Sequence, residues 1–228
     1  MKNLFYSFFE LVYPDLCSGC NNGLLVNEKV LCAFCLVNLP KADIGLLTSN
    51  DLEKRFYGKV SFGHAFVYLR FQKKSIVQNI LFDIKYGGNK GAGRYLGEKF
   101  GMEILKKSPS FKPDLIAPIP LHLKRFKSRG YNQSFVIGEG LGKILGVTCK
   151  EVVERVVSNT TQTKINRILR WKNVDGIFQV RDDSEVSGKH ILLIDDVVTT
   201  GSTMEACLVA LLDAGASKVS IASLAIAT

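Results

Sequence analysis

The hydrophobic positions of this chain fall into short apolar runs that alternate with segments of helical spacing. The apolar runs predict strands at residues 64–71, 114–119, 147–153, 176–180, 190–194 and 218–226. Apolar residues that recur every three or four positions predict helices at 75–85, 93–106, 132–145 and 203–214. Because strands alternate with helices, we expect a mainly parallel sheet with helices on both faces. Such sheets bind ligands beyond the carboxyl ends of their strands, which indicates the loops after Ile119 and Ile194.

The first 17 residues are rich in apolar and aromatic side chains at helical spacing, and they predict a short helix packed on the rest of the protein. The segment contains Glu10 and lacks a small-residue cleavage site, which argues against a signal peptide. No apolar run approaches the ~20 residues that a membrane helix needs. With 46% hydrophobic and 22% charged residues, the composition is that of a globular protein with a closed core. We expect a cytoplasmic protein without membrane insertion.

The formal net charge is +9, which favours association with polyanions, although solubility alone also explains a charge surplus. The distribution of the charge says more. No acidic residue lies between Asp114 and Glu139 or between Glu154 and Asp175. The basic residues in these two intervals are Lys124, Arg125, Lys127 and Arg129, and then Arg155, Lys164, Arg167, Arg170 and Lys172. Both intervals also contain aromatic and amide side chains, and basic segments interleaved with aromatic residues are compatible with binding of single-stranded DNA.

Four of the six cysteines form two closely spaced C-x-x-C pairs, Cys17 with Cys20 and Cys32 with Cys35. Two such pairs place four thiolates around one point, and Zn²⁺ prefers a tetrahedral sulfur site of this kind. With all four positions filled by protein, the site would be structural rather than catalytic. Two disulfides or a redox-active pair are the alternatives. Disulfides need an oxidising compartment, which nothing in the sequence indicates. A redox-active cysteine pair would not need a second C-x-x-C pair beside it.

The segment from Ile191 to Glu205 combines an apolar strand, two adjacent carboxylates and a turn that opens a helix. Backbone N–H groups of such a turn, together with the positive end of the helix, form an anion site. Gly201 lets the backbone approach a phosphate, and hydroxyl groups that can donate to the phosphate come from Thr199, Thr200, Ser202 and Thr203. Asp195 and Asp196 would repel a phosphate, so we expect them to accept hydrogen bonds from the hydroxyl groups of a ribose.

A helix cap is the alternative interpretation of this turn, because Ser202-x-x-Glu205 matches the capping box. Capping does not exclude phosphate binding, and it does not explain two acids and four hydroxyl groups in one loop. A Walker loop is excluded, because the chain contains no G-x-x-x-x-G-K-[ST] pattern. We therefore predict that the segment binds a ribose 5-phosphate group.

Residues Ile191–Thr203 resemble the loop that binds phosphoribosyl pyrophosphate (PRPP) in type I phosphoribosyltransferases. Several further segments resemble the ComF/ComFC competence family, and the resemblance spans nearly the whole chain. These segments are the four-cysteine knuckle, Lys85-Tyr86-Gly87, Pro118–Leu121, Arg129–Ser134 and the stretch from Gln162 to Phe178. The resemblance implies a type I phosphoribosyltransferase-like domain at residues 46–228, with a mainly parallel sheet and helices on both faces. It also implies an N-terminal helix and a small four-cysteine zinc finger at residues 1–45.

The resemblance further implies roles for individual residues. Asp195 and Asp196 would bind the ribose hydroxyl groups, and residues 199–203 would bind the 5-phosphate. Mg²⁺ would be carried by oxygens of the ligand and by water, as suits an ion that loses its water reluctantly.

The pyrophosphate of PRPP would lie at the turn after residue 117, through Pro120 and Leu121, with Arg125 and Arg129 within reach. Residues 155–174 match a mobile flap, from which Arg167 and Arg170 would close over the pyrophosphate and exclude water. A general contact with polyanions is the equal alternative for these arginines.

The ComF resemblance implies a factor of DNA uptake in natural transformation that binds both PRPP and single-stranded DNA. The nucleic-acid candidates are Lys124, Lys127, Tyr131, Lys164 and Lys172. A working phosphoribosyltransferase that joins PRPP to a nucleobase or an amine is the second hypothesis, because the fold permits this reaction without establishing it. An adaptor that docks a competence helicase through the zinc module is the third.

Overall fold

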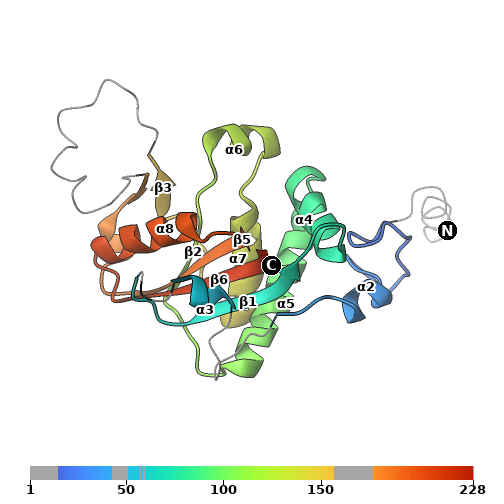
Figure 1. Ribbon diagram of the computed structural model, residues 1–228, viewed down its shortest axis with the longest axis horizontal. Helices are drawn as coiled ribbons and strands as arrows, with labels where there is room; N and C mark the ends of the chain where they lie inside the picture. Colours follow the sequence, from blue (N-terminus) through green and yellow to red (C-terminus); the bar gives the residue numbers. More distant parts are fainter. Residues whose placement is uncertain (1–14, 43–50, 57, 59, 157–176, 228) are drawn as a thin grey trace, which may run out of the picture.

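The computed structural model describes residues 15–42, 51–56, 58, 60–156 and 177–227. Its main sheet has four strands in the order β1-β6-β5-β2, and every neighbouring pair is parallel (Figure 1). The strands are β1 (Ala65–Phe71), β2 (Leu115–Pro118), β5 (His190–Val198) and β6 (Lys218–Ala227). The predicted parallel sheet is therefore confirmed. Although β6 comes after the other three strands in the sequence, it lies inside the sheet, between β1 and β5.

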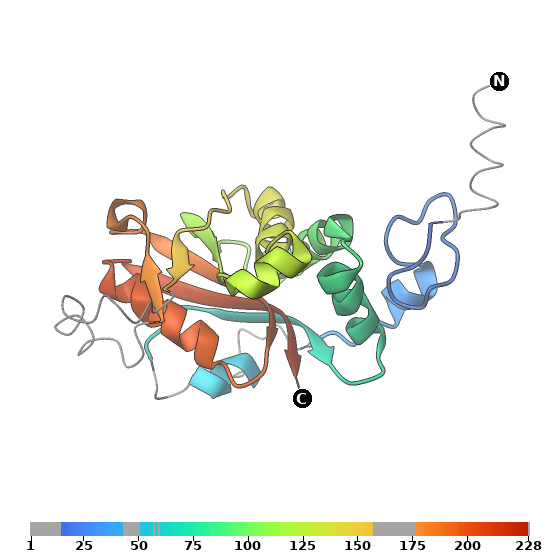
Figure 2. The same cartoon turned by 90° about the horizontal axis from the view of Figure 1, so that it is seen from above.

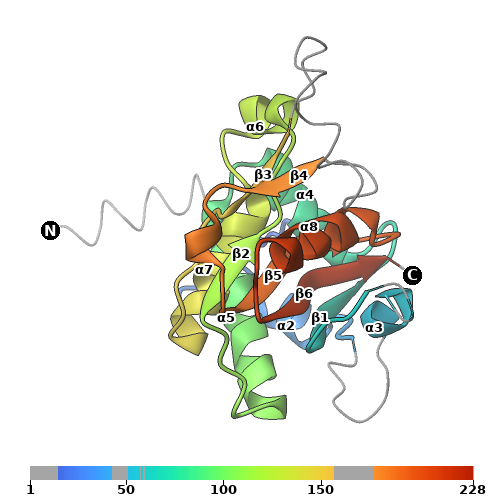
Figure 3. The ribbon, with the colours of Figure 1, turned by 90° about the vertical axis from the view of Figure 1, so that its left-hand side faces the viewer.

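Helices cover both faces of this sheet (Figure 3). One face carries α4 (Ile76–Tyr86), α5 (Lys90–Lys107) and α7 (Gln133–Leu145), and the other carries α3 (Asp51–Phe56) and α8 (Ser202–Asp213). Successive residues of a strand point to opposite faces, so a sheet covered on both sides needs continuously apolar strands. In β5, Leu192 and Ile194 pack with the first group of helices, while Ile191 and Leu193 pack with the second.

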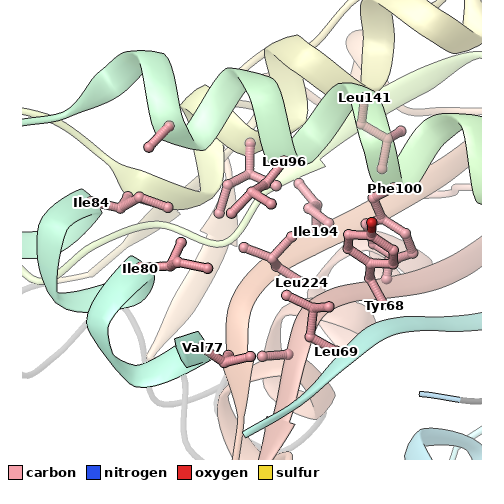
Figure 4. Packing of buried hydrophobic residues seen from close by; sticks show 14 of the residues in the cluster. Tyr68, Leu69, Val77, Ile80, Ile84, Leu96, Phe100, Leu141, Ile194 and Leu224 are labelled. Carbon is pink, nitrogen blue, oxygen red and sulfur yellow. The ribbon is translucent and has the colours of Figure 1, made fainter. Parts of the chain in front are cut away.

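The core beneath α4 and α5 consists of large aliphatic and aromatic side chains (Figure 4). Ile80 and Ile84 of α4 and Leu96 and Phe100 of α5 are fully buried. Tyr68 of β1 stacks on Phe100, with 5.5 Å between the ring centroids. Burial of each such side chain stabilises the fold by about 1.5–3 kcal/mol, so this core holds α4 firmly on the sheet.

Glycines allow α5 and α7 to pack in direct backbone contact. A Cβ atom on Gly97 of α5 would lie 2.1 Å from the carbonyl oxygen of Ile137. On the facing helix, a Cβ atom on Gly140 would lie 2.0 Å from the carbonyl oxygen of Arg94. No side chain fits at either position, because real Cβ atoms do not approach backbone atoms within 3 Å. The contact fixes α7, whose first turn reaches the end of β5.

One expectation for the region after α7 is corrected. Residues 147–153 do not form a strand of the main sheet, and a single parallel bridge joins Cys149 to Ile116. Thr148 and Lys150 are exposed, as at the edge of a sheet. The strand found here is β3 (Val153–Arg155), which pairs antiparallel with β4 (Phe178–Val180) in a separate two-stranded sheet.

Three short helices were not predicted: α2 (Ala33–Val37), α6 (Leu123–Arg129) and the 3-10 turn η2 (Asp183–Glu185). Every residue of α6 is at least partly exposed, so this helix has no apolar face that periodicity could reveal. His122 caps its start through its side chain, and Gly130, with a φ of 75°, ends it. The predicted N-terminal helix lies outside the described residues, except for its last three positions.

The four-cysteine segment packs against α4 (Figure 2). Cys17 and Cys35 belong to the same buried cluster as the apolar face of α4. The Asn79 side chain donates a hydrogen bond to the carbonyl oxygen of Gly19 at 2.7 Å, and the Ser18 hydroxyl donates to Asp83 at 2.6 Å. The segment is thus tied to α4 by apolar and polar contacts, while the boundary at residue 45 stays a prediction.

Gly97→Ala tests the contact between α5 and α7. We expect the added methyl group to push α7 away and to lower the free energy of unfolding by about 2–3 kcal/mol, measured by urea denaturation. Gly91→Ala on the same helix is the control, because its Cβ would meet only the tip of the Asn89 side chain, at 3.3 Å. An equal effect of both substitutions would contradict the contact, since alanine otherwise favours a helix over glycine.

Candidate functional site

The turn that follows β5 lines a small open pocket at the carboxyl end of the sheet. The pocket has room for about 40 Å³ and is formed by Asp195 and by residues 197–204. Thr199, Thr200, Ser202 and Thr203 are exposed around it, and Gly201 forms its buried floor. The five residues predicted to bind a phosphate therefore lie together. Since α8 begins at Ser202, its free N–H groups and the positive end of its dipole add to the field at this pocket.

Gly201 gives the turn a shape that other residues rarely adopt. Its φ is 89°, in the left-handed region, and a Cβ at this position would lie 3.0 Å from the ring of Phe56 in α3. Gly201 is also the residue that caps α8, so Ser202 lies at the first helical position. The predicted capping box, which needs Ser202 at the cap, is therefore corrected.

The two carboxylates belong to β5 itself, because the strand continues to Val198 rather than ending at Ile194 as predicted. Asp195 accepts hydrogen bonds from the Ser134 hydroxyl at 3.0 Å and from the Asp196 N–H at 2.8 Å. Asp196 forms an ion pair with Lys85, with 2.9 Å between Nζ and Oδ2. The two side chains of this pair are only 22% and 14% exposed, so the pair is largely shielded from water.

Burial and then the neighbouring charge of Asp196 raise the pKa of Asp195 to about 7. Hydrogen bonds from the Asp196 N–H and from Ser134, and the charge of Lys85, act in the opposite direction and are outweighed. Near neutral pH, Asp195 can therefore both donate and accept hydrogen bonds. This capacity suits sugar hydroxyl groups, which also do both.

Sequence reasoning missed Ser134 and Lys85 as members of the site. Ser134 comes from the first turn of α7, where Asn132 caps the helix by accepting from the Ser134 N–H. Lys85 comes from the last turn of α4. Both stand in segments that carry the family resemblance, but no spacing pattern relates them to Asp195 and Asp196.

The turn predicted to hold pyrophosphate lies beside the carboxylates. The Ile119 N–H donates to the carbonyl oxygen of Ile194 at 2.9 Å, and the Asn132 side chain donates to the carbonyl oxygen of Ile119 at 3.0 Å. Pro120 and Leu121, the next two residues, are half-buried.

The two described arginine candidates differ in their surroundings. Arg125 is exposed on α6. Arg129 donates to Gln133 at 2.8 Å and to the Tyr86 hydroxyl at 3.3 Å, and its guanidinium lies over the Tyr86 ring at 5.1 Å. Arg167 and Arg170 lie outside the described residues.

The nucleic-acid candidates divide in a similar way. Lys124 and Lys127 are exposed on α6, which projects above the main sheet in the view of Figure 1. Tyr131 is only 7% exposed, and its hydroxyl donates to the carbonyl oxygen of Ile84, so its ring is not open to stacking with a base. The exposed aromatic side chains of these two helices are Phe126 on α6 and Phe82 and Tyr86 on α4. Lys164 and Lys172 lie outside the described residues.

The four predicted metal ligands converge. The Sγ atoms of Cys17, Cys20, Cys32 and Cys35 all lie within 4.8 Å of one another. Cys20 and Cys32 are 3.7 Å apart, close to the ~3.8 Å that a regular tetrahedron with Zn–S bonds of about 2.3 Å requires. All four are free thiols, and a disulfide needs about 2.05 Å between sulfurs. The cluster can hold a metal ion.

The ionisation of the four cysteine thiols also favours binding of a cation. Burial raises the pKa of Cys17, but N–H donors of Cys32, Gly19 and Cys20 outweigh it and lower the value to about 7. Burial and the neighbouring sulfurs raise the pKa of Cys35 well above its usual range. Four thiolates this close repel one another, and a divalent ion would remove that repulsion.

Known proteins resemble part of this chain. The model of the family described as phosphoribosyl transferase domain matches residues 132–227. The DNA utilization protein YhgH of Escherichia coli is 36% identical over 110 residues, which are 48% of this chain and 48% of that protein. Competence protein F of Haemophilus influenzae is 33% identical over 94 residues, 40% of this chain and 41% of the relative. Competence protein ComFC of Bacillus subtilis is 32% identical over 101 residues, 44% of this chain and 39% of the relative.

These relatives, together with the domain match, support the ComF family for this chain. Its fold is of the phosphoribosyltransferase type, as the family match and the parallel sheet covered on both faces show. The match spans about half the length of the curated relatives. Among solved structures, the glutamine PRPP amidotransferase from B. subtilis is similar with a TM-score of 0.44 and 16% identity, over 62% of this chain and 30% of that one. Within the described residues, no helix has the length and apolar character to cross a membrane.

Asp195→Asn tests the electrostatics of the site. The pKa of an unfolded aspartate is about 4, whereas that of Asp195 is raised to about 7 in the fold. Between these values the folded protein binds more protons than the unfolded chain, so Asp195 lowers stability as the pH rises. We expect the variant to be more stable than the parent by about 1–3 kcal/mol at pH 8, with the difference vanishing toward pH 4.

The measurement is urea denaturation across this pH range. Asp213→Asn, at the exposed far end of α8, is the control and should show no such dependence. A difference between Asp195→Asn and the parent that does not change with pH would refute the raised pKa.

Proposed function

We propose that this ComF-family protein acts in DNA uptake, binds PRPP at the pocket after β5, and contacts single-stranded DNA through α6. The observation that carries the proposal is the placement of an anion-binding turn directly beside two partnered carboxylates. A ribose 5-phosphate has a dianion at one end and hydroxyl groups at the other, which matches this order of donors and acceptors. The role in DNA uptake is supported by relatives that are called competence and DNA utilization proteins.

In the proposed complex, the 5-phosphate accepts hydrogen bonds from the turn at residues 199–203. The ribose hydroxyl groups meet Asp195 and Asp196 at the end of β5. The diphosphate lies toward Pro120 and Leu121, with Mg²⁺ carried by diphosphate oxygens and water. Zn²⁺ in the cysteine cluster would be structural, since all four positions are filled by protein sulfur and the cluster packs on α4.

A double substitution, Asp195→Asn with Asp196→Asn, tests the ribose assignment. Because both hydroxyl-binding carboxylates are lost, we expect the affinity for PRPP with Mg²⁺ to fall by about 100-fold or more in calorimetric titration. The zinc content, expected to be one ion per chain, should stay unchanged, because the cysteine cluster lies on the other side of α4. Asp213→Asn should bind PRPP like the parent. Normal PRPP binding by the double variant would rule out the ribose assignment.

Removal of two lysines tests contact with nucleic acid. Each phosphate contact with a single strand contributes about −0.7 to the slope of log affinity against log salt. We therefore expect Lys124→Ala with Lys127→Ala to weaken binding of a fluorescent oligothymidine and to reduce this slope by about 1.4. Lys106→Ala with Lys107→Ala, which removes two exposed lysines at the end of α5, is the matched control. If both pairs change the slope equally, α6 is not the contact surface.

A phosphoribosyltransferase reaction is the second candidate, and the match to the phosphoribosyl transferase domain favours it. In that case the protein would release pyrophosphate from PRPP when an acceptor is offered. A pyrophosphate assay with each common nucleobase, compared between the parent and the Asp195→Asn, Asp196→Asn variant, separates turnover from binding alone.

A further inference from the structure

Three cations gather around one tyrosine at the end of α4, next to the carboxylates of β5. Lys85 pairs with Asp196 at 2.9 Å, and Tyr86 is the next residue in the chain. Tyr86 is 62% exposed, lies beneath the Arg129 guanidinium and accepts a hydrogen bond from it at 3.3 Å. The hydrogen bond and charge of Arg129 lower the pKa of Tyr86, and the charges of Lys85 and Arg125 lower it further. Arg129 thus contacts Tyr86 directly, and Lys85 and Arg125 add positive charge to the same corner.

This corner has more positive charge than the described residues neutralise. Of these three cations, Lys85 forms an ion pair with a carboxylate, that of Asp196. Arg129 is held by two neutral groups, the Gln133 amide and the Tyr86 hydroxyl. In the described part of the chain, no ion pair joins Arg125 or Arg129 to an acid. The corner is thus complementary to a ligand group that carries more than one negative charge.

We propose that Lys85, Tyr86 and Arg129 form a subsite for the diphosphate group of the sugar ligand. Lys85 exchanges its partner on binding: the ribose hydroxyl groups take over Asp196, and the released ammonium group contacts the diphosphate. This inference rests on the proposed function. It adds Lys85 and Tyr86 of α4 to the pyrophosphate-binding residues expected from the sequence, which lie in the loop after β2, in α6 and in residues 155–174.

The chemistry of the ligand places the diphosphate at this corner. In a 1-diphosphorylated ribose, the diphosphate is attached to C1, and C1 is bonded to the carbon that bears the 2-hydroxyl. If Asp195 and Asp196 bind the ring hydroxyl groups, the diphosphate must lie within a few ångströms of Asp196. Lys85 already lies there, and Tyr86 holds Arg129 by a cation–π contact and a hydrogen bond on the same side.

The alternative is that the Lys85–Asp196 ion pair has only a structural role, and this alternative predicts a different result. If Lys85 only neutralises Asp196, its loss disturbs the carboxylates and weakens every sugar phosphate alike. If Lys85 binds the diphosphate, its loss weakens only the ligand that carries this group. The comparison of PRPP with ribose 5-phosphate, both with Mg²⁺, therefore separates the two roles.

The experiment is calorimetric titration of the parent protein and of Lys85→Met with both ligands. We expect the parent to bind PRPP more tightly than ribose 5-phosphate. Lys85→Met should lose about 10-fold to 100-fold in PRPP affinity, as for a charge-assisted hydrogen bond, and should bind ribose 5-phosphate as the parent does. Lys85→Arg should recover most of the loss. Lys99→Met, which removes a lysine that lies over Tyr95 on α5, should leave both affinities unchanged.

Tyr86→Phe is a second variant, and it leaves the Lys85–Asp196 pair in place. It tests the subsite if Lys85→Met proves unstable. Because it removes only the hydrogen bond to Arg129, we expect a smaller loss for PRPP, about threefold, and none for ribose 5-phosphate. Equal losses for the two ligands in Lys85→Met, or no loss for either, would overturn the subsite. If the parent protein bound neither ligand, the proposed PRPP binding would be refuted, and the diphosphate subsite would be refuted with it.

Discussion

Two neighbouring carboxylates at the end of a largely buried strand must each have a partner, and the arrangement of helices around the site follows from this requirement. Burial of two adjacent negative charges is costly unless hydrogen bonds or opposite charges compensate it. Ser134, at the start of α7, donates to Asp195, and Lys85, at the end of α4, pairs with Asp196. Both helices lie on the same face of the sheet. Their two ends are therefore held at the carboxyl end of β5.

The positions of α4 and α7 depend in turn on more distant contacts. Close packing through Gly97 and Gly140 places α7 against α5. The four-cysteine segment packs against α4 and is hydrogen-bonded to Asn79 and Asp83 on that helix. A segment that contains none of the ligand-binding candidates is thus only one helix away from Asp196. A metal ion in this segment would stabilise α4 without touching the ligand.

The sequence could predict the parts of this structure that depend on local patterns. Apolar runs identified the four parallel strands, and helical periodicity identified α4, α5, α7 and α8. The hydroxyl-rich turn was recognised because its residues are consecutive. Lys85 and Ser134 were not found, since each meets its carboxylate across more than sixty residues of chain. The short helix α6 was missed because it buries no side chain, and Ser202 was expected to cap α8 because the left-handed conformation of Gly201 is not visible in a pattern of residue types.

The position of β6 inside the sheet has a consequence for biosynthesis. During translation, β1 emerges from the ribosome long before β6, yet β6 is its hydrogen-bonded parallel neighbour. Until residues 218–227 are available, the facing edges of β1 and β5 are unpaired, and such edges are prone to wrong pairing with other chains. The sheet, and with it the end of β5, can therefore assemble only after β6 has been synthesised.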